Sequence, residues 1–210
     1  MINTKISLRH IQKRYNGRDL FAPSLNVDIS SGDKFVIVGP SGVGKSTILN
    51  MIMGFVIPDS GDISYNSELL SKKAITRFRA HSAYIPQSLD FKKSIGVREF
   101  IDIPFKFKVN KLIVPNESEI LYLMDKLMLK HELLNSVYND LSGGEKQRFV
   151  TLIALLLKRD VYIMDEPTSN LDSESSSRLI KLIEESDKTF IISSHDINLR
   201  SISTNLLELK

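Results

Sequence analysis

The 210-residue chain contains no cysteine. Neither a disulfide framework nor a thiolate metal site can therefore form, whatever fold the chain adopts. A chain without structural disulfides is compatible with a reducing compartment, and we expect a cytoplasmic setting.

Long apolar runs are also absent. The longest covers residues 152–157, within the apolar stretch 149–157, and is far shorter than the ~20 residues that cross a bilayer. Residues 1–10 are polar and alternating and lack the basic stretch and apolar run of a secretory signal, so we do not expect export by that route. Any contact with a membrane is expected to come through a partner.

The chain carries no strong excess of charge. Its 28 basic and 25 acidic residues give a net charge of +3, which is too mild to indicate a nucleic-acid partner, and the basic residues form no stripe with interleaved aromatics. Two short basic clusters are expected to be solvated faces: Lys72, Lys73, Arg77 and Arg79 in one, and residues 106–111 in the other.

The hydrophobic pattern predicts an α/β fold in a single domain of residues 1–210. A length of 210 residues with 42% hydrophobic residues is enough for one substantial core. Alternating patterns predict half-buried strands, whereas continuous apolar runs predict the covered strands of a parallel sheet. The alternating segments are 5–11 and 25–29, and the continuous ones are 35–38, 161–164 and 189–192.

Helical periodicity separates these strands. It covers residues 46–53, 117–130, 144–158 and 174–184. Residues 88–140 differ from the rest, because Pro104 and Pro115 punctuate a Lys-rich helical stretch. We interpret this stretch as a helical subdomain inserted into a core formed by residues 1–87 and 141–210.

A glycine-rich loop joins the predicted strand at 35–38 to the helix that follows it. It has the pattern G-x-x-x-x-G-K-[ST], in which backbone N–H groups surround phosphates and the helix directs its positive end at the same anion. Lys45 supplies a cation for the outer phosphates, and the Ser46 hydroxyl is a ligand for Mg²⁺. We therefore predict binding of a nucleoside triphosphate with Mg²⁺ by Gly39, Pro40, Ser41, Gly42, Val43, Gly44, Lys45, Ser46 and Thr47.

Two carboxylates follow the apolar run at 161–164. Asp165 and Glu166 would lie at the carboxyl end of a buried parallel strand, where such sheets present catalytic residues. Asp165 can hold the Mg²⁺ shell, and Glu166 can act as the general base for water that attacks the γ-phosphate. Alone, an apolar run ending in Asp-Glu usually marks a strand entering a turn; beside the phosphate loop it indicates hydrolysis.

A second glycine pair begins the helix predicted near residue 144. Ser142 is placed as its N-cap, and Gly143 and Gly144 expose backbone N–H groups at the helix start, which is a second phosphate-binding end. Elsewhere such a Ser-Gly-Gly would be a turn that caps a helix. With this run, Leu141 to Arg148, the chain resembles the ATP-binding subunits of ABC transporters, whose signature sequence and order of motifs it reproduces over nearly its whole length.

The resemblance implies a fold, an activity and partners. The fold would be a P-loop NTPase core, with a RecA-like parallel sheet, an N-terminal antiparallel β element and an inserted α-helical subdomain. The activity would be Mg²⁺-dependent ATP hydrolysis that powers transport through separate membrane permease subunits. The chain would pair around ATP, as a homodimer or with a second ATPase subunit, and lie in the cytoplasm at the inner face of the cell membrane.

The resemblance also assigns further residues. Tyr15 is similar to the aromatic that stacks on adenine, although an ordinary edge-strand tyrosine stays the alternative, and Asn16-Gly17 marks the turn after it. Gln87 is similar to the glutamine that touches Mg²⁺ and the attacking water, and His195 to the histidine that contacts the γ-phosphate. Asp172 corresponds to the residue that reaches the opposite subunit, and it can also cap the helix that follows. Ser142, Gly143 and Gly144 would serve the nucleotide of that opposite subunit.

Three positions depart from the family pattern. Glu145 replaces the commoner glutamine, Ile153 stands where an arginine is frequent, and Arg159 stands where a proline is frequent. None of the three removes a catalytic group, so the departures concern local packing.

Competing functions lack their sequence markers. An ABC ATPase that acts on DNA or ribosomes is the nearest alternative, but such relatives usually carry long insertions or tandem cassettes. A GTPase would need an Asn-Lys-x-Asp run, which the chain does not contain. Transport is therefore the favoured function, and the resemblance implies that the membrane subunits determine the cargo.

Overall fold

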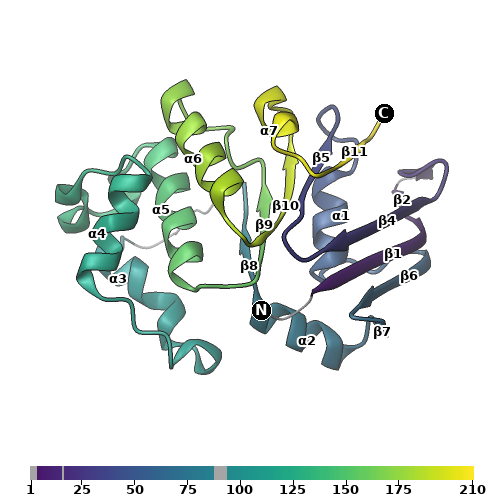
Figure 1. The fold of residues 1–210 in the computed structure, drawn as a ribbon, viewed down its shortest axis with the longest axis horizontal. Coiled ribbons are helices and arrows are strands. Elements are labelled where there is room, and N and C mark those ends of the chain that lie inside the picture. Colours follow the sequence, from purple (N-terminus) through teal and green to yellow (C-terminus); the bar gives the residue numbers. More distant parts are fainter. Residues whose placement is uncertain (1–3, 16, 88–93) are drawn as a thin grey trace.

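The computed structural model describes residues 4–15, 17–87 and 94–210 (Figure 1). Its larger sheet is parallel throughout, with the strand order β11-β5-β10-β9-β8. The strands are β5 (Lys34–Val38), β8 (Ser82–Ile85), β9 (Val161–Asp165), β10 (Thr189–Ser194) and β11 (Asn205–Glu208). Every residue of β5, β9 and β10 is buried, because helices or a second sheet cover both faces. The predicted parallel sheet is confirmed.

A smaller antiparallel sheet is built mainly from the N-terminal part of the chain. Its strand order is β4-β1-β6-β7, and the inward residues of β1 and β4 alternate with outward ones, as the sequence pattern predicts. These strands are β1 (Lys5–Gln12), β4 (Leu25–Ser30), β6 (Ser60–Tyr65) and β7 (Glu68–Leu69). A separate hairpin pairs β2 (Arg14–Tyr15) with β3 (Arg18–Asp19). Of its predicted turn, Asn16 lies outside the described residues and Gly17 has a positive φ of 79°.

Helices occupy most of the remaining chain. The α-helices are α1 (Lys45–Ile52), α2 (Lys72–His81), α3 (Val97–Asp102), α4 (Glu117–Lys126), α5 (Gly143–Leu156), α6 (Ser173–Glu185) and α7 (Ile197–Ser201). Short 3₁₀ helices are η1 (Ile103–Lys106), η2 (Lys108–Asn110), η3 (His131–Asn135) and η4 (Tyr138–Asp140). In the part of the chain that the structure describes, no helix has the length and apolar character needed to span a bilayer.

One predicted helix is too long. The pattern over 117–130 indicates a single helix, but α4 ends at Lys126. Met128 has a φ of 56°, in the left-handed region, and the chain then turns into η3. Leu127 continues the helical spacing of Ile120 and Met124, and it is buried together with Leu129, so packing of the turn accounts for the apolar pattern although the helix has ended.

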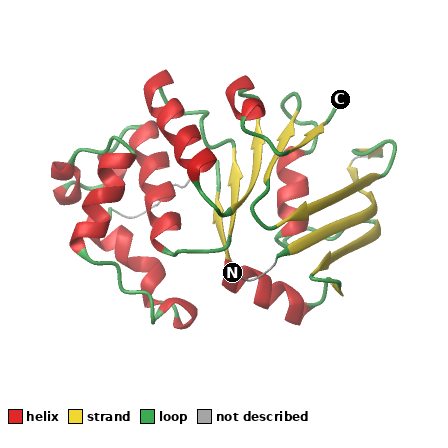
Figure 2. Cartoon of the chain, in the orientation of Figure 1, coloured by secondary structure: helices red, strands yellow, loops and turns green. Residues whose placement is uncertain are grey.

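The parallel sheet lies between a layer of helices on one side and α1 with the antiparallel sheet on the other (Figure 2). It separates two hydrophobic clusters. Val36 and Val38 of β5 face the cluster shared with α3, α4, α5 and α6. Phe35 and Ile37 of the same strand face the cluster shared with α1 and the antiparallel sheet. The two clusters hold the strand ends, and the loops that leave them, in fixed positions.

Candidate active site

The glycine-rich loop leaves the carboxyl end of β5 and enters α1. Gly44, at the start of α1, has a φ of 109°, and a Cβ there would lie 3.2 Å from the ring of Phe21. The backbone conformation therefore favours glycine at this position, and any larger residue would also have to displace the Phe21 ring slightly. Around Gly42, whose φ is 78°, a Cβ would meet nothing within 4 Å, so the loop is open on that side.

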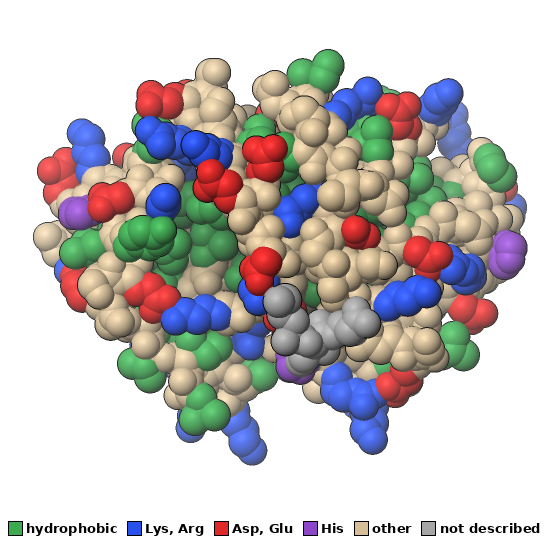
Figure 3. Space-filling model, in the orientation of Figure 1, with side chains coloured by type: hydrophobic (Ala, Val, Ile, Leu, Met, Phe, Trp, Pro, Cys, Tyr) green, Lys and Arg blue, Asp and Glu red, His purple; other side chains and the backbone are tan. Residues whose placement is uncertain are grey.

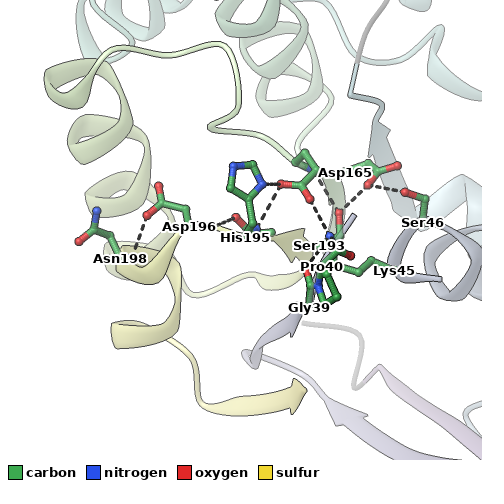
Figure 4. Close-up of polar contacts among 11 residues, drawn as sticks. Gly39, Pro40, Lys45, Ser46, Asp165, Ser193, His195, Asp196 and Asn198 are labelled. Carbon is green, nitrogen blue, oxygen red and sulfur yellow. Dashed lines mark hydrogen bonds and ion pairs between the residues drawn. The ribbon is translucent and has the colours of Figure 1, made fainter. Parts of the chain in front are cut away.

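The ammonium group of Lys45 lies inside this loop. It donates hydrogen bonds to the carbonyl oxygens of Gly39 at 2.9 Å and Pro40 at 3.2 Å, and it lies 3.1 Å from Oε1 of Glu166 (Figure 4). The Lys45 side chain is 7% exposed, so its charge is balanced by the carboxylate and the two carbonyls and little by solvent. A cation held in this way is positioned to contact an anion that enters the loop.

Asp165 joins the loop to the parallel sheet. Its Oδ1 accepts hydrogen bonds from the hydroxyls of Ser46 at 2.9 Å and Ser193 at 2.5 Å (Figure 4). A hydroxyl and a carboxylate oxygen so close together are oxygen donors of the kind that Mg²⁺ uses when phosphates and water complete its shell. Among the described residues, no group of three or more His, Asp or Glu side chains could hold a metal ion. A metal ion at Asp165 and Ser46 would therefore need ligands from a phosphate or from water. The residues present therefore fit a magnesium–nucleotide complex.

Glu166 lies between the cation and the predicted histidine. Its Oε1 lies 3.1 Å from Lys45, and its Oε2 lies 2.8 Å from Nδ1 of His195. Its backbone has a φ of 49°, which is uncommon for a residue with a long side chain, and its N–H donates to both the carbonyl and the hydroxyl oxygen of Ser193. The sheet therefore holds Glu166 in a strained conformation that turns its carboxylate toward the loop.

One cavity of about 300 Å³ collects nine of the eighteen predicted site residues, whereas Asp165 and His195 lie beside it and do not line it. It is lined by Tyr15, Leu20, Ser41, Gly42, Gly44, Lys45, Ser46, Thr47, Gln87 and Glu166. Tyr15 lines this cavity and is 45% exposed, so its ring is accessible to a planar ligand. Leu20 was missed by the sequence analysis, and no motif marks it, because it reaches the cavity through the fold of the segment after β3.

The serine–glycine pair lies outside this cavity. Ser142 is the N-cap of α5, as predicted: its hydroxyl accepts a hydrogen bond from the Glu145 N–H, while Oε2 of Glu145 accepts bonds from the N–H and hydroxyl of Ser142 at 2.8 Å each. Burial raises the pKa of Glu145, but the hydrogen bonds from Ser142 together with the charges of Arg148 and Lys130 give a net shift downward. Glu145, the first departure from the family pattern, therefore completes a capping box.

Gly144 is required by packing. A Cβ at this position would lie 2.8 Å from the carbonyl oxygen of Asn170, whereas one at Gly143 would meet nothing closer than 3.9 Å. The start of α5 thus lies directly against the loop that leads to Asp172. Asp172 is the N-cap of α6, also as predicted, and the hydrogen bonds from the N–H and hydroxyl of Ser175 lower its pKa.

The other two departures are also explained by packing. Ile153 is buried on α5. Arg159 donates a hydrogen bond to the side chain of Asn110, which belongs to η2, and therefore ties the loop before β9 to the helical segment.

A strand that ends in a glycine loop, a lysine and serine at the start of the next helix, and an aspartate on a neighbouring parallel strand define the P-loop nucleotide-binding class. The model of the family described as ABC transporter matches residues 23–169. The chain belongs to the ABC transporter family, in which it is an ATP-binding and ATP-hydrolysing subunit. The resemblance drawn from the motifs is confirmed.

Relatives and solved structures agree. The chain is 30% identical to the ergothioneine transport ATP-binding protein EgtV of Helicobacter pylori (strain G27), with 98% of this chain and 97% of that protein covered. It is 30% identical to the lipoprotein-releasing system ATP-binding protein LolD of Buchnera aphidicola, with 93% and 90% covered. The dimeric structure of the cassette MJ0796, from Methanocaldococcus jannaschii, superposes with a TM-score of 0.78 at 26% identity and covers 98% of this chain and 94% of that one. A second structure of MJ0796, in a post-hydrolysis state with ADP and Pi, gives the same TM-score at 25% identity over 98% and 94% of the chains.

Proposed function

We propose that the chain hydrolyses Mg²⁺-ATP with Glu166 as the general base and uses the reaction to drive a separate membrane permease. The observation that carries the proposal is the position of the Glu166 carboxylate, which lies within hydrogen-bond distance of both Lys45 and His195 at the edge of the glycine loop. Adenine would stack on Tyr15, and the triphosphate would follow the loop toward Lys45.

The residues around the phosphates divide the remaining work. Ser46 and Asp165 would hold Mg²⁺, which neutralises phosphate charge when bound. Lys45 would exchange its loop carbonyls for phosphate oxygens, and Glu166 would then accept the proton of the attacking water. His195 would contact the γ-phosphate, and Gln87, which lines the cavity, would orient the water.

The site would be completed by a second copy or a related ATPase subunit. Two observations support this: Ser142, Gly143 and Gly144 do not line the cavity, and MJ0796, which covers nearly the whole chain, is dimeric. In a two-fold pair, the start of α5 and Asp172 of one subunit would face the nucleotide of the other. ATP would then stabilise the pair, and hydrolysis would release it.

The permease would dock beside Gln87. A groove of about 320 Å³ opens between β8, α5 and the helical segment, and its lining is largely apolar. It includes Tyr84, Pro86, Phe100, Val109, Ile153 and Leu157. We retain the division into a core (1–87 and 141–210) and a helical subdomain (88–140), of which residues 88–93 lie outside the described part. This groove at their junction would transmit movement of the helical subdomain to a permease at the inner face of the cell membrane.

The test of the site is Glu166→Gln, with Glu184→Gln, an exposed carboxylate on α6, as matched control. We expect the first variant to bind ATP like the wild type and to hydrolyse it roughly 10²- to 10⁴-fold more slowly, as for loss of a general base. The control should be unaffected. Undiminished turnover by Glu166→Gln would refute the role of the carboxylate.

The same variant tests the pairing. Light scattering should detect a dimer with Mg²⁺-ATP but not with ADP, and the further change Ser142→Arg should abolish it by filling the anion site. Hydrolysis that is first order in protein and insensitive to Ser142→Arg would reject the shared site.

The permease is tested by purification of the native complex, which should recover a multi-span permease. Recovery with DNA or ribosomes instead would reject the transport function.

A further inference from the structure

Large apolar side chains are exposed in one short segment of the helical subdomain. Phe107 is 60% exposed, Val109 58%, Leu112 100% and Val114 81%. The other exposed large apolar residues of the described chain are spread over six regions: Tyr15, Phe55, Ile57, Leu69, Tyr122, Ile197 and Leu206. Exposed apolar side chains clustered in this way indicate a contact with a membrane or with another protein.

The charge of the same segment has one sign. Lys106, Lys108 and Lys111 are all exposed, and no acidic residue occurs between Asp102 and Glu117. Among the described residues, no salt bridge involves any of these three lysines. The segment 106–114, which we call the basic-apolar tip, therefore presents lysines interleaved with exposed apolar side chains. Figure 3 shows basic and apolar side chains together at the lower edge of the helical part of the molecule.

The fold holds the tip in this presentation. Asn110 lies at the centre of the tip and is 6% exposed. Its Nδ2 donates a hydrogen bond to the carbonyl oxygen of Pro104 at 2.8 Å, and its Oδ1 accepts one from Arg159. The backbone N–H of Asn110 donates to Phe107, and its carbonyl accepts from Ile113. Asn110, the uncharged polar residue of the tip, is thus buried and bonded on both sides, while Phe107, Val109, Leu112 and Val114 are exposed.

We propose that the basic-apolar tip contacts the surface of a bilayer that contains anionic lipid. Lysines attract acidic headgroups while Phe, Leu and Val enter the boundary of the acyl chains. A protein surface is the other occupant to consider, because Val109 also lines the groove that we assign to the permease. Phe107, Leu112 and Val114 do not line that groove, and the single sign of charge matches a continuous anionic surface. The basic cluster at residues 106–111, which the sequence predicts to be a solvated face, is thus exposed and is proposed to contact lipid.

Sedimentation of the isolated chain with vesicles tests the proposal. Phosphatidylcholine vesicles are compared with vesicles that also contain phosphatidylglycerol, without any permease present. We expect binding only to the anionic vesicles, and weaker binding as salt is raised. No binding to either vesicle would overturn the proposal, whatever the result for the permease, so the two proposals fail separately.

Variants assign the binding to the tip. The triple change Lys106→Gln, Lys108→Gln and Lys111→Gln should weaken it by roughly 10²-fold, and Leu112→Ser with Val114→Ser by about tenfold or more. Matched controls are Lys72→Gln with Lys73→Gln, on α2, and Ile57→Ser, which is 75% exposed in the wild type. ATP hydrolysis should be unchanged in all of them. Tip variants that bind the anionic vesicles like the wild type would show that the tip does not contact lipid and would overturn the proposal.

Discussion

Replacing Gly144 by alanine should destabilise the chain although alanine is the better helix former. The new Cβ would lie 2.8 Å from the carbonyl oxygen of Asn170, closer than packed atoms approach, and that oxygen belongs to the backbone, so the loop or the helix has to move. Overpacking of this kind costs about 1–3 kcal/mol. In a chain of this size, such a loss lowers Tm by about 2–12 °C.

Gly143→Ala is the matched control. Its Cβ would meet nothing closer than 3.9 Å, so we expect no loss of stability and a gain of up to about 1 kcal/mol from helix propensity. Urea unfolding of both variants with the wild type measures the difference. Equal free energies of unfolding for the two variants would refute the argument, because it rests on the contact with Asn170 alone.

Three further outcomes are expected. Tyr15→Ala should weaken ATP binding by ~1–3 kcal/mol in calorimetry while Tyr15→Phe should not, and equal affinities of all three proteins would return Tyr15 to a structural role. Arg159→Met should leave the buried Asn110 side chain short of a partner and cost about 1–3 kcal/mol in urea unfolding; no change would show that this bond contributes nothing. The hydrogen bonds from Ser175 lower the pKa of Asp172, so the stability they add is present above its ordinary pKa and is lost as pH falls toward the lowered one; Asp172→Asn should therefore show a flatter dependence of unfolding on acid pH, and an unchanged profile would contradict this.

The parts of the site that lie within one motif were predictable from sequence. The spacing of Gly39, Gly44, Lys45 and Ser46 predicts both the loop and the start of α1. The glycines permit the turn, and the helix begins directly after the last of them. Ser142 and Asp172 were also predictable as N-caps, since their side chains bond only three positions away.

Contacts between distant residues could not be predicted in this way. The bond from Arg159 to Asn110 joins residues 49 positions apart, and the left-handed backbone of Glu166 depends on Ser193 of a neighbouring strand. Neither leaves a local pattern. The end of α4 was missed for the opposite reason. Leu127 continues the helical spacing of Ile120 and Met124, but it is buried by packing of a turn and not by a further turn of helix.

The order of strands also constrains how the protein is made on the ribosome. β5, which leads into the phosphate loop, is bordered on one edge by β10 and on the other by β11, and its Lys34 pairs with Phe190. While residues up to Ser186 emerge, the apolar strand β5 has both edges unpaired, although the loop that it carries has long been synthesised. Nascent chains of this protein should therefore be most prone to aggregate, and most dependent on chaperones, just before translation reaches the final strands.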